Sequence, residues 1–163
     1  MTTQTVASQA AHALLDALKA EYDRYRDAVS FIPTPKLRLQ EDLRRYICLR
    51  CAGFLEQVTY VVLEHYLDQK SSGPIQEFAQ SHLDVPNLRL QPFRRLVGRF
   101  GEGALSSFDT LIVGARKDAL SDLFEVRNDI AHGGFHGGQK LNPDRYVMLC
   151  EDIYKWLINE FAT

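Results

Sequence analysis

The sequence has few of the residues that disulfide-stapled or strongly charged proteins depend on. Its 163 residues include only three cysteines, six prolines, two methionines and one tryptophan. Lysine and arginine together number 19 against 21 aspartates and glutamates, so the formal net charge is only −2. Three cysteines do not make a disulfide framework. A balanced charge excludes a protein whose whole surface attracts nucleic acid.

Long hydrophobic runs are also missing. No stretch of 18 consecutive apolar residues occurs, so we expect no membrane-spanning segment. The N-terminal segment lacks the basic region and apolar core of a secretory signal. The sequence therefore predicts a soluble, cytoplasmic protein.

What is present is the composition of an ordinary globular protein, with 45% hydrophobic and 25% charged residues. The length predicts one domain over residues 1–163, large enough to fold without a metal or disulfide. Among the cations, 13 are arginine and only 6 are lysine. Arginine is the residue suited to bidentate recognition of phosphate.

Helical periodicity and helix stops divide the chain into helices, and no segment favours a strand. Four main helices are predicted over 6 to about 30, about 37 to 69, about 117 to 132, and 143 to about 162. Short helices are expected at 75–83 and 93–100, with a loop at 84–92 between them. The second main helix is apolar on two faces, so it is either central in a bundle or shared with a partner subunit. The predicted fold is all-α, an up-and-down bundle of about four main helices plus short ones.

Cys48 and Cys51 form a C-x-x-C pair inside the second predicted helix. No second cysteine pair and no βαβ pattern accompanies them, and small thiols are common in helical cores. We therefore expect Cys48 and Cys51 to be core thiols and not a metal or redox site. Cys150 lies on the apolar stripe of the last helix.

The segment Glu125–Gly133 contains the most informative pattern, an Arg127-Asn128-x-x-x-His132 sequence that finishes a helix. At 100° per residue, Arg127 lies in the middle of the apolar arc of that helix. A guanidinium keeps its charge, so it must meet either a protein carboxylate or a phosphate. Asn128 and His132 lie one turn apart, and the negative end of the helix dipole favours a protonated imidazole there.

This pattern resembles the signature of the HEPN superfamily, an arginine followed by four to six residues and a histidine. The helix around Leu43–Gln57, the glycine-punctuated middle and the closing amphipathic helix resemble the RiboL-PSP type of HEPN domain. The resemblance implies a metal-independent endoribonuclease, toxin or antiphage effector that needs no cofactor. It implies a homodimer in which Arg127 and His132 are the catalytic pair and Asn128 supports them.

The implied reaction is attack of a ribose 2′-hydroxyl on the adjacent phosphate, which leaves a 2′,3′-cyclic phosphate and a 5′-hydroxyl. His132 acts in it as a general base or acid, and Arg127 holds the phosphoryl oxygens. RNA, a second copy of the chain and a restraining antitoxin or other regulatory protein are the partners that the resemblance implies.

Other residues are candidates for contact with RNA. Arg95 and Arg99 lie one turn apart on a predicted helix and form a ridge able to follow a phosphate backbone. Arg50 lies near the main apolar stripe of the second helix. His136 lies in a glycine-rich loop, where His132 and His136 lack the third ligand that a metal site needs.

Alternatives remain open at the sequence level. Arg127 is also compatible with a structural ion pair to Glu56 or Glu125, and His132 with a polar helix end. Asp129 is expected to be a solvated surface carboxylate. The competing functions are a non-catalytic helical module that binds a nucleotide or a protein partner, and a plain dimeric scaffold.

Overall fold

Seven helices and no strand make up the part of the chain that the computed structural model describes, residues 6–33, 36–85, 87–134 and 141–162. Four helices are long, as the sequence predicts, three are short, which is one more than predicted, and the all-α fold is confirmed. In chain order they are α1 (Val6–Phe31), α2 (Leu37–Lys70), α3 (Gly73–Ser81), α4 (Leu90–Gly98), α5 (Glu102–Leu111), α6 (Ala115–Ala131) and α7 (Pro143–Phe161).

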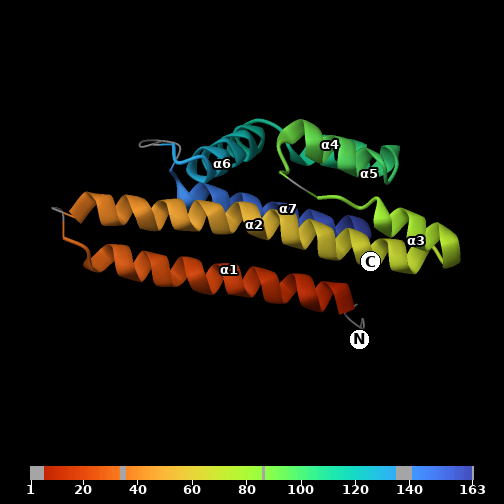
Figure 1. The fold of residues 1–163 in the computed structure, drawn as a ribbon, viewed down its shortest axis with the longest axis horizontal. Coiled ribbons are helices and arrows are strands. Elements are labelled where there is room, and N and C mark those ends of the chain that lie inside the picture. Colours follow the sequence, from red (N-terminus) through yellow and green to blue (C-terminus); the bar gives the residue numbers. More distant parts are fainter. Residues whose placement is uncertain (1–5, 34–35, 86, 135–140, 163) are drawn as a thin grey trace.

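The long helices alternate in direction along the chain, and the three short ones gather at one end (Figure 1). α1 and α2 form an antiparallel hairpin, and α7 packs along α2 and α1. α2 also contacts α6 and α3, so four helices surround it. Its two apolar faces are therefore explained by a central position within one copy of the chain.

The apolar stripes predicted from helical spacing form the core. On α7, Tyr146, Cys150, Ile153, Leu157 and Phe161 are all buried. On α2 the buried set extends around the helix, because neighbours cover it on several sides. All helices except α3 contribute to one cluster of buried side chains.

Two short elements differ from the prediction. α4 begins at Leu90 and not at residue 93, because Pro92 lies in its first turn. The first four N–H groups of a helix have no helical partner, so proline is tolerated there. α5 was not predicted at all, since its sequence EGALSSFDTL is rich in glycine, serine and threonine.

The helix α5 is held in place by tertiary contacts. Ala104 and Phe108, one turn apart, are buried on its inner face. The Phe108 ring packs edge-on to Trp156 of α7, with centroids 5.4 Å apart. The Trp156 Nε1–H donates a hydrogen bond to Ser107 Oγ at 2.8 Å. Packing on α7 therefore compensates for the weak helical propensity of α5.

The three cysteines are free thiols, and all are buried. Burial raises the pKa of the Cys48 thiol to about 12 and also raises the pKa of Cys150. The Cys150 S–H points to the Cys51 carbonyl oxygen, 3.5 Å away. The prediction that the C-x-x-C pair belongs to the core is confirmed.

α2 contains an 18-residue window with a mean hydropathy of 1.3, so its length and composition alone would suit a membrane span. Of that window, 56% is buried inside the protein. Burial of this kind is what a central core helix requires, and α2 holds that position.

Candidate functional site

The Arg127–His132 motif occupies the last turn of α6, where the helix ends in a Schellman motif. His132 is the C-cap residue, and Gly133 follows it with a left-handed φ of +72°. The Gly133 N–H donates to the Ile130 carbonyl at 3.1 Å, and the Gly134 N–H to the Asp129 carbonyl at 2.7 Å. These two bonds define the motif, and they need a residue such as glycine that adopts positive φ without strain.

Arg127 lies on the side of α6 that faces the bundle, close to the end of the helix. Its side chain is 35% exposed, so the guanidinium is at the edge of the core and not within it. The Nη1–H donates a hydrogen bond to Asn128 Oδ1 at 3.1 Å. Asn128 therefore orients the guanidinium of Arg127.

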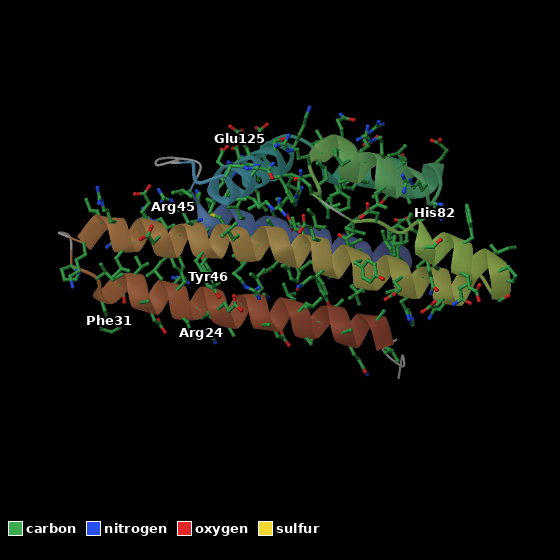
Figure 2. The ribbon with its side chains drawn as sticks, in the orientation of Figure 1. Arg24, Phe31, Arg45, Tyr46, His82 and Glu125 are labelled. Atoms are coloured by element: carbon green, nitrogen blue, oxygen red, sulfur yellow. The ribbon has the colours of Figure 1, made fainter. Side chains whose placement is uncertain are left out.

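The carboxylate that Arg127 meets is Glu56 of α2. The separation between Arg127 Nη2 and Glu56 Oε1 is 3.8 Å, which is an ion contact and too long for a hydrogen bond. Glu56 Oε1 accepts a hydrogen bond from the Asn87 backbone N–H at 2.8 Å. Glu125, the other carboxylate considered, is exposed on the outer side of α6 (Figure 2).

The hydrogen bond from the Asn87 backbone N–H to Glu56 was not predicted from the sequence. Asn87 has a φ of +47° and lies in the connection between α3 and α4. Asparagine tolerates this left-handed conformation, so the Pro86-Asn87 dipeptide is a turn signal. Sequence spacing gives no indication that a backbone N–H there reaches a carboxylate 31 residues away.

The His132 ring is exposed, and it makes no hydrogen bond or ion pair with any residue in the described ranges. Its backbone N–H donates to the Asn128 carbonyl at 3.0 Å, which fixes the main chain of the two residues. Within the described ranges, neither nitrogen of the imidazole has a partner. His136 lies outside the described residues.

Asp129 differs from its expected place on the surface. It is partly buried, because the Schellman turn folds the chain back over it. A Cβ atom added at Gly134 would lie 3.0 Å from the Asp129 carbonyl oxygen. This close approach is a second reason for glycine at the end of α6.

Arg50 is not brought to the motif. It lies between α2 and α1, where Nε–H and Nη2–H donate to the two oxygens of Glu21 at 2.6 and 3.0 Å. The hydrogen bond with Glu21 raises the pKa of Arg50 above its already high value. The guanidinium is thus engaged in a bidentate pair within the hairpin.

Arg95 and Arg99 are placed on α4 and at its C-cap, both exposed. They line a small hollow of about 180 Å³ together with Asp84 and Leu88. They therefore lie together beside the α3–α4 connection.

The end of α6 carries a guanidinium held by Asn128 and an exposed imidazole. A guanidinium stabilises charge on phosphoryl oxygens, and an imidazole moves protons near neutral pH. Within the described ranges, no group of three or more His, Cys, Asp or Glu side chains is placed to hold a metal ion.

Comparison with known proteins gives the family of the chain. The RiboL-PSP-HEPN family model matches residues 15–162, which include α2 to α7 and most of α1. No curated protein and no solved structure matches the chain. The matched span contains the Arg127–His132 motif at the end of α6. The chain belongs to the RiboL-PSP-HEPN family.

Proposed function

We propose that this protein is a metal-independent endoribonuclease whose active site combines Arg127, Asn128 and His132 from two copies of the chain. The observation that carries the proposal is the exposed His132 imidazole, one helical turn from Asn128, whose side chain orients the Arg127 guanidinium. HEPN membership supports an RNA-related role for this pair.

The reaction needs a base, an acid and a counter-charge. The base takes the proton of a ribose 2′-hydroxyl, and the 2′-oxygen forms a bond to the adjacent phosphorus. The bond from phosphorus to the 5′-oxygen breaks, and the acid gives that oxygen a proton. His132 supplies the proton transfers, and Arg127 stabilises the negative charge on the phosphoryl oxygens.

A homodimer suits this chemistry, because one copy offers a single His132 and the reaction uses a base and an acid. When the ends of two α6 helices meet, two imidazoles and two guanidinium groups share one cleft. The charge of each copy is nearly balanced, so the local arginines and not the net charge attract RNA.

The biological setting that we propose is a cytoplasmic toxin or antiphage effector. Cleavage of cellular RNA harms the host, so such an enzyme requires restraint by an antitoxin or another regulatory protein. The partners are therefore RNA, a second copy and this regulator.

The test is cleavage of single-stranded RNA in EDTA, with product ends identified by mass spectrometry. We expect 2′,3′-cyclic phosphate and 5′-hydroxyl ends, and a loss of at least about 100-fold in rate for Arg127→Ala and for His132→Ala. Arg24→Ala is the matched control, because Arg24 is exposed on α1 on the opposite side of the bundle (Figure 2).

The contact between Arg127 and Glu56 defines the contrary outcome. If folded protein cleaves no RNA and Arg127→Ala mainly lowers the melting temperature, the arginine is a structural partner of Glu56. The protein is then a non-catalytic module that binds a nucleotide or a protein.

A further inference from the structure

α3 is attached to the bundle without burying any of its residues, and it leaves a hollow beside α4. Its Ile75 and Phe78 side chains are 73% and 65% exposed. The hollow has a volume of about 400 Å³, and its walls include Leu67, Phe78, His82, Leu96, Arg99 and Phe100. Ligand sites in proteins have volumes in this range.

Two rings form one wall of this hollow. The Phe78 and His82 rings have centroids 4.2 Å apart and planes inclined by 34°. The orientation of His82 is set locally, because its Nδ1 lies 2.8 Å from the Phe78 carbonyl oxygen and 3.0 Å from Ser81 Oγ. Figure 2 shows His82 where the end of α3 meets the α4–α5 pair. A ring pair ordered before binding is a surface on which a nucleic acid base stacks.

Of three arginines on α4 and at its C-cap, one is paired with a carboxylate and the side chains of the other two are not. Arg94 donates two hydrogen bonds of 2.7 Å to the carboxylate of Asp109. In the described part of the chain, the side chains of Arg95 and Arg99 form no hydrogen bond and no ion pair. Arg99 lines the 400 Å³ hollow, and it also lines the smaller hollow with Arg95. Positive charge is therefore available next to the ring pair.

A third hollow connects this region with the motif. It has a volume of about 390 Å³ and includes Glu56, Leu83 and Asp84. Leu83 is shared with the hollow that contains the ring pair, and Glu56 contacts Arg127. Along α2, Glu56 and Leu67 are separated by about 16 Å at 1.5 Å per residue. The two hollows thus adjoin at Leu83, and Glu56, which contacts Arg127, lines one of them.

We propose that the hollow between α3 and α4 is a subsite for single-stranded RNA, distinct from the Arg127–His132 motif. An unpaired base stacks on Phe78 and His82, and the backbone phosphates next to it contact Arg99 and Arg95. The inference rests on the proposed function, and it adds that the substrate is single-stranded and extends several nucleotides away from the cleaved bond. A combination of stacking rings and unpaired arginines favours a base with a phosphate over an apolar peptide.

The experiment measures binding of a 12-nucleotide RNA with 2′-O-methyl groups, by fluorescence anisotropy at several salt concentrations. This RNA has no free 2′-hydroxyl, so wild-type protein binds it without cleaving it. Phe78→Ala and Arg99→Ala are each expected to raise the Kd about five-fold or more. Arg99→Ala also lowers the slope of log Kd against log salt by about 0.7.

Two further variants complete the test. One is expected to lower the Kd for RNA, and the other is a control that leaves it unchanged. Asp84 places a carboxylate in the hollow with Arg95 and Arg99, so Asp84→Asn is expected to lower the Kd. Arg24→Ala removes an exposed arginine of α1 and leaves the Kd unchanged. Phe78, Arg99 and Asp84 are exposed, so circular dichroism melts of all variants should match that of the wild type.

The outcomes separate this inference from the proposed nuclease activity. The subsite is overturned if Phe78→Ala and Arg99→Ala leave the Kd unchanged. It is also overturned if the wild-type protein does not bind the 12-mer. Both conclusions hold whatever the cleavage assay shows. A Kd raised by both variants in a protein that cleaves no RNA retains the subsite and overturns the nuclease.

Discussion

The charge of Arg127 is shared between an amide that orients it and a carboxylate that it does not hydrogen-bond. The Nη2 to Glu56 Oε1 separation of 3.8 Å is too long to satisfy the guanidinium, and one third of the side chain is exposed. A phosphate that reaches Arg127 therefore competes with Glu56 for the same positive charge.

We predict that Glu56→Gln tightens binding of an uncleavable RNA several-fold. The glutamine keeps an oxygen that accepts the Asn87 N–H, and the substitution removes only the competing negative charge. Anisotropy gives the Kd, and a thermal melt checks the fold. Weaker RNA binding by a well-folded Glu56→Gln protein would show that the carboxylate holds Arg127 in its working position.

The buried thiols allow a second prediction at this scale. Cys48 has no exposed surface, and burial raises its pKa to about 12, so almost no thiolate is present near neutral pH. We expect the native protein to resist Ellman's reagent at pH 8 and to release three equivalents of chromophore after denaturation. Fast reaction of a native thiol would contradict the core assignment.

The same burial predicts that the folded protein loses stability as the pH becomes alkaline. The pKa of Cys48 is raised to about 12 by burial, and the pKa of Tyr22 to about 12 by burial and a hydrogen bond to Asp144. In the unfolded chain these groups titrate near about 8.5 and 10, so the unfolded state loses protons first as pH rises. The free energy of unfolding is therefore expected to fall from about pH 9 towards pH 12, as measured by urea denaturation. Tyr22→Phe should make this fall shallower.

At the scale of helices, the end of α6 depends on Gly133. Its φ of +72° is unfavourable for any residue with a Cβ, although no atom lies within 4 Å of the position that the Cβ would occupy. We predict that Gly133→Ala costs about 1 kcal/mol of stability through backbone strain alone. Because the Schellman turn positions His132, the same variant should also slow RNA cleavage.

Gly53 is the matched control in the interior of α2. It has helical backbone geometry and equally open space around its Cβ position. Gly53→Ala is expected to stabilise the protein by about 0.5–1 kcal/mol. Two glycine-to-alanine changes of opposite sign in urea denaturation would isolate the backbone effect, and equal signs would argue against it.

The short helices show where local sequence was insufficient. The long helices follow from periodic apolar residues and from stops such as Pro33 and Gly133, which act within a few residues. α5 has poor local propensity, and contacts with Trp156 of α7 stabilise it. α4 includes Pro92, and a proline usually indicates the end of a helix. Only the structure shows that Pro92 lies in the first turn, where a helix tolerates it.

At the scale of the whole molecule, the proposed dimer predicts complementation between inactive variants. Arg127→Ala and His132→Ala proteins are each expected to be inactive. After they are mixed, unfolded together and refolded, heterodimers carry one Arg127 and one His132 in a shared cleft. The single His132 of the heterodimer serves as the base and water replaces the second imidazole as the acid, so we expect only a small part of the wild-type cleavage rate to return, with a dimer seen by sedimentation velocity. Full cleavage by a monomeric wild-type protein would overturn the composite site.

The sequence by itself determined the helical class, the apolar stripes, the core position of the thiols and the Arg127–His132 motif at a helix end. These features depend on spacings of three or four residues and on local caps, so they can be read along the chain. Tertiary structure alone decided that Glu56 is the carboxylate beside Arg127, that Glu21 engages Arg50, and that Phe78 and His82 share a hollow with Arg99. Those pairings join residues that are distant in sequence or on different helices. Only the packing of α1, α3 and α6 against α2, and of α4 against α6, brings them together.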